Sequence, residues 1–188
     1  MKKETQNITA LKSQTWITEA LLALMEEKEF NKITITEIIK KADLTRQAFY
    51  RNFNTEEEVL HEYVKKLYKD CFDEIEQMPQ KNMYKILVTY FHYWHKNKDF
   101  LLLVKKSKVN HKVMNFYYPY MGKYFDQAII KLYANSDLEI SYMKHFLLGG
   151  LVQVKAHWLE NNFIETPDQL AELVLKLINP LVYDVKEL

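Results

Sequence analysis

Thr34–Phe53, TITEIIKKADLTRQAFYRNF, reads as two short helices joined by a tight turn. Apolar residues in its first half recur at i, i+3, i+4 and i+7, so one face of that helix must pack on something. Thr34 and Glu37 have the spacing of a capping box, and Thr45 offers a cap for the second helix after the turn at 42–44. The pattern predicts a pair of packed helices rather than a strand.

The second helix of this stretch is short and has two distinct sides. Ala48 and Phe49 fall on its inner side. Arginine and glutamine are the side chains that read guanine and adenine edges in a major groove, and tyrosine and arginine also suit phosphate contact. The pattern therefore indicates a helix-turn-helix that binds DNA, with an outward face formed by Arg46, Gln47, Tyr50 and Arg51.

The composition of the 188-residue chain favours an all-α protein with about nine helices. Hydrophobic residues make up 48% of it, whereas only three glycines and four prolines interrupt it. The formal charge is +1, and Met1–Leu60 holds nine Lys and Arg against ten Asp and Glu. Any DNA contact must therefore be local, without a general basic field. We expect a cytoplasmic protein, because no signal region and no long apolar run is present.

Helical spacing continues on both sides of the motif. A helix from about Thr9 to Lys28 would support the motif, after a polar arm that ends near Asn7. Thr55 and Glu58 begin a connecting helix that ends before Met78-Pro79-Gln80. Its lone cysteine, Cys71, lies on the apolar stripe and reads as a buried thiol. Further helices are expected over about 82–96, 100–106, 110–133 and 137–161, with a last one starting at 166.

The carboxy-terminal part is rich in aromatic residues. Many of them lie on the expected helices 82–96 and 110–133, and they are too many for one buried stripe. They could line a cavity for a small apolar or aromatic ligand, or they could simply pack in the core. The candidates for a pocket are Phe91, Trp94, His95, Phe116, Tyr117 and Tyr120.

The last two expected helices are candidates for a homodimer interface built as a four-helix bundle. Two glycines lie in the middle of the first of them, where each costs about 1 kcal/mol relative to alanine. A close helix-helix contact, within the protomer or across a dimer, would compensate for that cost. The candidate interface residues are Gly150, Val154, Trp158, Leu173 and Leu177.

Metal-binding and catalytic patterns are weak in this sequence. His92 and His95 are three residues apart on one helix, but no third ligand is evident nearby. No glycine-rich phosphate loop and no nucleophile elbow is present. We therefore expect no metal, no cofactor and no enzymatic activity.

The pattern T-x-x-x-I-x-x-x-A-x-L-T-x-x-x-F-Y-x-x-F, followed by a capped long helix and a helical remainder, resembles the tetracycline-repressor family of one-component regulators. LLGGLVQVKAHWLENNF, at 147–163, looks like a subgroup common in low-GC Gram-positive bacteria. The resemblance implies a DNA-binding domain over 1–54, a connecting helix over 55–77 and a domain for ligand binding and dimerisation over 78–188. It implies a homodimer that binds a palindromic double-stranded DNA operator.

Carried over residue by residue, the resemblance assigns DNA contacts to both helices of the motif. Three positions depart from the family pattern: Asp43 replaces the turn glycine, Asn52 a histidine and Glu56 a lysine. Asp43 tolerates a left-handed conformation better than most residues, Asn52 still has a donor for phosphate, and Glu56 would repel phosphate. The implied DNA contacts are Thr34, Thr36, Thr45, Arg46, Gln47, Tyr50, Arg51 and Asn52.

Two functions follow as hypotheses. The first is a ligand-responsive repressor that a small molecule releases from its operator by changing the pose of the connecting helix. The second is a regulator of the same fold that acts mainly through a protein partner, with weak or no DNA binding. Glu56 and the slightly acidic amino-terminal part motivate the second hypothesis.

Overall fold

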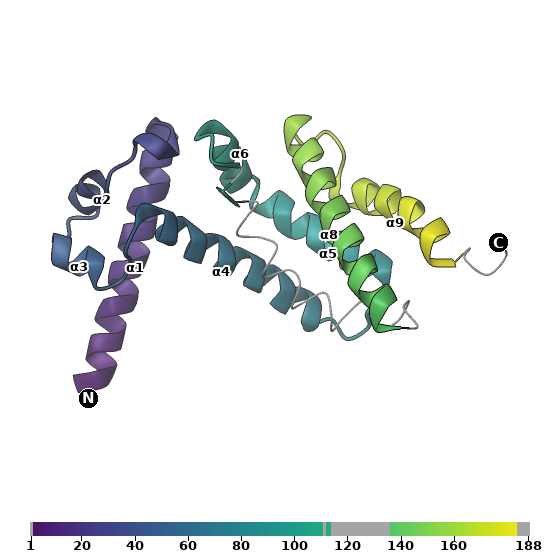
Figure 1. Ribbon diagram of the computed structural model, residues 1–188, viewed down its shortest axis with the longest axis horizontal. Helices are drawn as coiled ribbons and strands as arrows, with labels where there is room; N and C mark the ends of the chain where they lie inside the picture. The colour runs from purple at the N-terminus through teal and green to yellow at the C-terminus, as the bar shows by residue number, and fades with distance from the viewer. Residues whose placement is uncertain (1, 111, 114–135, 184–188) are drawn as a thin grey trace. The chain divides into compact units, whose positions relative to one another are not determined.

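The computed structural model describes residues 2–110, 112–113 and 136–183, and every regular element in these ranges is helical. Contacts divide the chain into two compact units (Figure 1). Unit 1 contains the residues up to Lys66 and the segment Leu102–Val113, and unit 2 contains Leu67–Leu101 and the described residues from Ser136 onward. The division falls inside two helices, so each of them supplies residues to both units.

Unit 1 is built around α1, Lys2–Glu27. The short helix η1, Phe30–Lys32, leads to α2, Ile35–Lys41, and α3, Arg46–Tyr50, and both α2 and α3 pack against α1 (Figure 1). The helix α1 begins at Lys2, earlier than the expected start near Thr9, so the expected polar arm is helical. The shared core of these helices consists of Ile17, Leu21, Met25, Ile38, Phe49 and Phe53.

The segment Leu102–Val113 packs in unit 1, although the sequence analysis placed it in the domain 78–188. Its first residues end α6, Lys98–Lys106. The backbone N–H of Phe30 donates to the carbonyl of Ser107 across 2.9 Å. Lys106 and Lys108 form ion pairs with Glu26 and with Glu29, which lie at the end of α1 and just after it. These contacts join residues about 80 positions apart, so no local pattern reports them.

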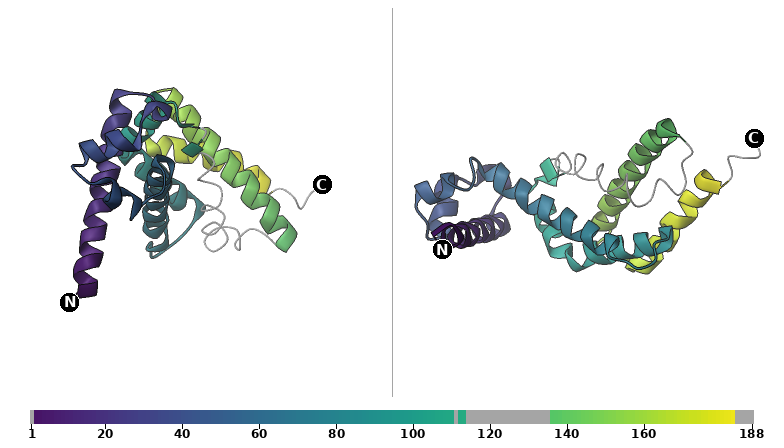
Figure 2. Two further views of the ribbon diagram at one scale, coloured as in Figure 1. Left: turned by 60° about the vertical axis from the view of Figure 1, so that its left-hand side comes forward. Right: turned by 90° about the horizontal axis from the view of Figure 1, so that it is seen from below.

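Unit 2 holds the second half of α4, Glu56–Glu76, with α5, Met83–Lys96, α8, Asp137–Glu160, and α9, Pro167–Tyr183. The helices α5 and α9 lie against each other (Figure 2). Phe91 and Trp94 of α5 and Trp158 of α8 are almost completely buried. Cys71 of α4 is buried as predicted, and burial raises the pKa of its thiol.

Capping explains where several helices begin. Asn82 accepts a hydrogen bond from the Lys85 N–H across 2.9 Å at the start of α5, and Ser136 caps α8 in the same way. Thr166 and Gln169 form a reciprocal capping box at the start of α9, with bonds of 2.9 and 3.2 Å. The expected starts of α8 near 137 and of α9 near 166 are thus confirmed, because capping depends only on residues a few positions apart.

Candidate functional site

The geometry of α2, the turn and α3 is that of a helix-turn-helix. The capping box at α2 is complete: the Glu37 N–H donates to Thr34 Oγ1 across 3.3 Å, and the Thr34 N–H donates to Glu37 Oε2 across 3.1 Å. Thr45 Oγ1 caps α3 by accepting from the Ala48 N–H across 3.1 Å. Because Phe49 is fully buried beneath α3, the orientation of this short helix is fixed by the core of unit 1.

The turn between α2 and α3 is a Schellman motif that depends on Asp43. Asp43 has φ 53°, in the left-handed region that usually favours glycine. The Leu44 N–H donates to the Ile39 carbonyl across 3.0 Å, and the Asp43 N–H donates to the Lys40 carbonyl across 3.4 Å. Asp43, which stands where the family pattern has glycine, therefore adopts the left-handed conformation that glycine would adopt there.

The outward face of α3 has the side chains that the sequence analysis assigned to DNA. Arg46, Gln47, Tyr50 and Arg51 are exposed. Arg46 Nη2 lies 3.3 Å from Tyr50 Oη, and its guanidinium carbon lies 5.5 Å from the centre of the Tyr50 ring. Tyr50 also meets the buried Phe49 ring edge to face at 5.6 Å, so Arg46 rests on an aromatic side chain that the core holds in place.

The flanking candidates for DNA contact are placed differently from one another. Thr34, Thr36 and Thr45 are exposed, but the hydroxyls of Thr34 and Thr45 serve as helix caps. Asn52 is half-buried, and its Nδ2 donates to the Ala48 carbonyl across 2.7 Å. One amide hydrogen of Asn52 is thus used to close α3, which leaves Asn52 one donor for phosphate.

The acidic start of α4 is largely engaged by neighbouring groups. Glu58 accepts from the backbone N–H of Asn54 at 2.6 Å, while Thr55 Oγ1 caps the Glu58 N–H at 3.1 Å. In the expected capping box the Glu58 carboxylate would accept from the Thr55 N–H. It accepts from the N–H of the preceding residue, Asn54, instead. Glu57 pairs with Lys112. Glu56 is half-exposed and has no ion pair or hydrogen bond to the residues that the structure describes.

Tertiary contacts change the charge of the DNA-reading unit. Leu102–Val113 brings four lysines and no acidic residue into unit 1, which makes this unit net positive although Met1–Leu60 is net −1. Lys28 pairs with Glu37, and hydrogen bonds from Lys28 and Thr34 lower the pKa of Glu37 to about 2. Lys41 pairs with Glu27 at 2.7 Å. Several carboxylates of unit 1 thus have a nearby cation.

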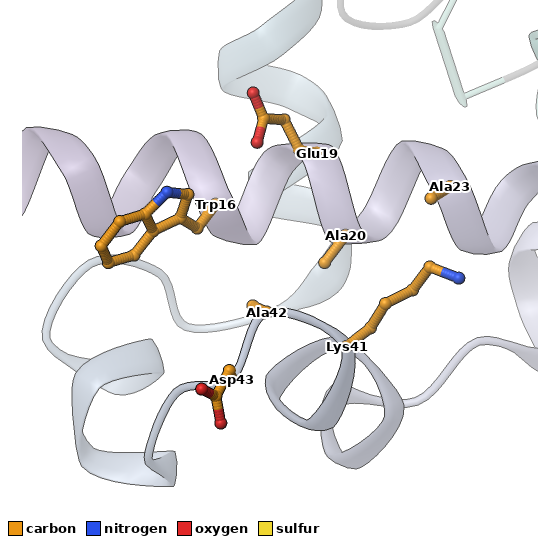
Figure 3. Close-up of a pocket in the computed structure, with 7 residues that line it drawn as sticks. All are labelled: Trp16, Glu19, Ala20, Ala23, Lys41, Ala42 and Asp43. Atoms are coloured by element: carbon orange, nitrogen blue, oxygen red, sulfur yellow. The ribbon is translucent and has the colours of Figure 1, made fainter.

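A shallow pocket of about 440 Å³ lies between α1 and the end of α2 (Figure 3). The helical spacing of Trp16 and the buried Ala20 predicts that Trp16 is buried as well, but Trp16 is 48% exposed and borders this pocket beside the α2–α3 turn. Glu19 and Ala20 of α1 line this pocket, together with Ala42 at the end of α2 (Figure 3). A larger groove of about 760 Å³ in the same unit lies between the middle of α1, residues 11–22, and the first half of α4. Neither hollow involves the residues that the sequence nominated for a ligand.

The nominated ligand residues within the described part of the chain lie in the core of unit 2. The rings of Phe91 and Trp158 meet edge to face at 5.8 Å, and the ring of His95 stacks on Trp158 at 5.7 Å. His92 Nε2 lies 2.9 Å from Asp168 Oδ2, so this histidine ties α5 to α9. No cluster able to hold a metal ion occurs among the described residues. Phe116, Tyr117 and Tyr120 lie outside the described residues.

Sequence reasoning missed a charged residue inside this core. Lys155 of α8 is buried, and its Nζ donates to Tyr68 Oη of α4 across 2.6 Å. The ammonium lies 3.7 Å from the centre of the Trp94 ring. A signal was present in the sequence, because Lys155 follows Leu148 and Leu151 at i+7 and i+4 on the apolar stripe of α8.

The nominated dimer residues are partly exposed. Leu173 and Leu177 on α9 and Gly150 on α8 are exposed, and Val154 is half-buried. Among the described residues, a Cβ atom at Gly150 would meet nothing within 4 Å, so no close contact with a described helix explains this glycine. Trp158 differs, because it is buried in the core of unit 2, where its Nε1 donates to the Glu165 carbonyl at 3.0 Å. The α8 face adds exposed apolar side chains that the sequence analysis did not nominate: Leu138, Tyr142 and Phe146.

These features define a DNA-binding regulator with a helix-turn-helix on a helical body. Residues 17–63 match the family described as bacterial regulatory proteins, tetR family, and residues 81–180 match a transcriptional regulator C-terminal region. The chain belongs to the TetR family of bacterial transcriptional regulators. This assignment confirms the predicted family and the all-α fold with its amino-terminal helix-turn-helix. The TetR family consists of regulators rather than enzymes.

Several solved structures have a similar fold. A TetR transcriptional regulator from Streptococcus agalactiae 2603V has a TM-score of 0.68 at 19% identity, over 94% of this chain and 98% of that one. The dihydroxyacetone kinase operon activator DhaS has a TM-score of 0.58 at 20% identity, over 93% and 96%. The fatty acid degradation regulator FadR from Bacillus halodurans has a TM-score of 0.59 at 16% identity, over 93% and 96%. No curated protein matches the chain significantly. Among the described residues, no helix is long and apolar enough to cross a membrane.

Proposed function

We propose that this chain is a homodimeric, ligand-responsive repressor that binds a palindromic operator. The observation that carries the proposal is the exposed face of α3, on which Arg46 rests against Tyr50 above the buried Phe49. A preorganised arginine loses little side-chain freedom when it binds a guanine edge. The proposed contact residues are those of the outward face, with Thr36 beside them and one amide hydrogen of Asn52.

Dimerisation through α8 and α9 follows from their exposed apolar side chains. Leu138, Tyr142 and Phe146 recur every four residues along α8, and Leu173 and Leu177 do so along α9. Apolar side chains at i and i+4 lie on one side of a helix, and a paired copy would remove them from water. Two α8 helices could also approach closely at Gly150, where the backbone carries no side chain. A dimer would place two α3 helices for two half-sites one DNA turn apart.

Release by a ligand is proposed to act through α4. This helix begins beside the DNA-reading helices and contributes Tyr68 and Cys71 to the core of unit 2. A ligand that favours another pose of α4 would change the separation of the two half-site readers. The ligand is expected to be small and apolar or aromatic, because aromatic side chains dominate this core.

A second candidate function is regulation through a protein partner, with weak DNA binding. The half-exposed Glu56 beside the DNA-reading face favours this reading, because its carboxylate would repel a nearby phosphate. One protein of similar fold is named as an operon activator, so a role other than repression has a precedent in this fold.

The deciding experiment measures binding of the purified protein to the promoter fragment beside its own gene and to a random duplex of the same length. Specific binding that weakens steeply between 50 and 200 mM salt, about 10-fold or more, supports the first function, because phosphate contacts release counterions. Equal and weak binding to both duplexes supports the partner function. Size-exclusion chromatography of the same preparation tests the dimer.

A further inference from the structure

A cluster of polar groups lies buried among aromatic rings in unit 2, outside the DNA-reading site. It joins Lys155 of α8, Tyr68 of α4, and Tyr90 and Trp94 of α5, all of them buried. Besides the hydrogen bond to Tyr68 and the close contact with the Trp94 ring, the Lys155 ammonium lies 4.8 and 5.9 Å from the Tyr68 and Tyr90 ring centres. Two helices, α4 and α5, thus place aromatic rings around a cation from a third, α8.

The ring that holds the ammonium also carries a directed donor. Trp94 is 1% exposed, and its Nε1–H has no hydrogen-bond partner among the described residues. A buried N–H that stays unpaired costs about 1 to 3 kcal/mol. The Lys155 ammonium faces the same ring from 3.7 Å, so the two donors lie close together. An acceptor with two oxygens suits this pair, with one oxygen for each donor.

Burial makes the charge of Lys155 costly. Desolvation lowers the pKa of Lys155 to about 7, and the charge of Cys71 acts in the opposite direction. Contacts with ring faces offset part of the lost hydration, and a carboxylate at hydrogen-bond distance would stabilise the ammonium further. Replacement of such a lysine by an apolar side chain is often neutral or stabilising, so stability alone is a poor explanation for its presence.

We propose that Lys155 and the Trp94 indole N–H form the recognition point for the carboxylate of a small ligand, whose apolar body contacts the surrounding rings. This inference rests on the proposed ligand response, for which it names the chemical class of the ligand. A carboxylate that binds the ammonium competes with the Tyr68 hydroxyl for its protons. Because Tyr68 belongs to α4, the first effect of the ligand falls on the helix that continues into unit 1.

The pH dependence of binding follows from the same geometry. Within the part of the chain that the structure describes, the titratable groups that face Lys155 include Tyr68 and Cys71 on α4 and Tyr90 on α5. A bound carboxylate favours the ammonium and raises the pKa of Lys155 above its value in the free protein. Carboxylate binding is therefore strongest below pH 7 and falls, by up to about tenfold per pH unit, as the pH rises above 7.

The test compares two carboxylates with neutral alcohols of the same body, by calorimetry on the full-length protein. The pairs are phenylacetate with 2-phenylethanol and octanoate with octan-1-ol. At least one carboxylate should bind about tenfold or more tightly than its alcohol, and Lys155→Met should remove that difference and its pH dependence. Trp94→Phe keeps the ring and removes the N–H, so it should weaken carboxylate binding several-fold. His92→Gln, on the exposed side of α5, is the matched control and should bind like the wild type.

Several outcomes overturn the inference. They are equal binding of carboxylate and alcohol, absence of binding by both carboxylates, and a Lys155→Met variant that discriminates like the wild type. Circular dichroism verifies the fold of each variant. If Lys155→Met does not fold, the inference is tested by Trp94→Phe, and unchanged carboxylate binding by that variant overturns it. Promoter binding by the ligand-free wild type is measured separately. Carboxylate discrimination without promoter binding would remove the proposed repressor function and leave the carboxylate site standing.

Discussion

Replacement of Arg46 by alanine should strongly weaken sequence-specific DNA binding while leaving the fold intact. Its contacts with Tyr50 lie on the surface, one residue pair four positions apart on α3, so their loss should cost only a few tenths of a kcal/mol of stability. A bidentate arginine contact with guanine contributes about 1 to 3 kcal/mol of discrimination. A dimer loses it at both half-sites, so specific affinity should fall by at least about 30-fold.

The assay is fluorescence anisotropy with the labelled promoter fragment and a random duplex of equal length. Arg46→Ala should lower affinity for the promoter far more than for the random duplex. Arg46→Lys keeps the charge but lacks the planar fork, so it should keep random binding and lose promoter preference. Lys96→Ala, an exposed charge on α5, is the control and should change neither affinity. Equal losses on both duplexes would refute the assignment of Arg46 to base reading, as would a loss of helical signal.

Three further predictions concern stability and assembly. Asp43→Gly should raise the stability of unit 1 by up to about 1 kcal/mol in urea unfolding, because glycine adopts the left-handed turn without strain; a loss would show that the Asp43 side chain supports the turn. Leu173→Glu with Leu177→Glu should turn the dimer into a monomer in sedimentation velocity while the helical signal is kept, since both side chains are exposed in the protomer; an unchanged dimer would place the interface elsewhere. The Lys28–Glu37 pair lowers the folded pKa of Glu37 to about 2, so its stabilising effect is present above pH 4.5 and disappears as the pH falls toward 2; Glu37→Gln should flatten that part of the acid unfolding profile, and an unaltered profile would contradict the pairing.

The sequence predicted those parts of the fold that depend on near neighbours. The capping box at Thr34 and the left-handed turn at Asp43 each involve residues within five positions, so their spacing is visible in the chain. The exposed face of α3 follows from the same local periodicity, once Phe49 is assigned to the core. Local chemistry therefore fixes both the shape of the reading helix and the set of side chains it presents.

Other features depend on tertiary contacts that spacing does not report. The Phe30 to Ser107 hydrogen bond joins residues far apart in the chain, and it accompanies the packing of Leu102–Val113 in unit 1. Trp16 fits the apolar stripe of α1 by periodicity, yet it is exposed because α2 and α3 cover only part of that helix. Lys155 shows the opposite case. A lysine normally indicates an exposed face, but Lys155 is buried because aromatic side chains of α4 and α5 surround it.

The electrostatic environment of α3 shows why these distant contacts matter for function. Met1–Leu60 taken alone is slightly acidic, which argues against DNA binding, but four lysines from Leu102–Val113 join the same unit. Lys106, Lys108 and Lys112 form ion pairs with carboxylates of the amino-terminal part. Because exposed pairs contribute little to stability, their larger effect is to neutralise carboxylates that would otherwise oppose phosphate. We therefore expect the approach of DNA to α3 to depend on Leu102–Val113, which begins within α6, and substitution of these lysines should weaken binding to promoter and random DNA alike.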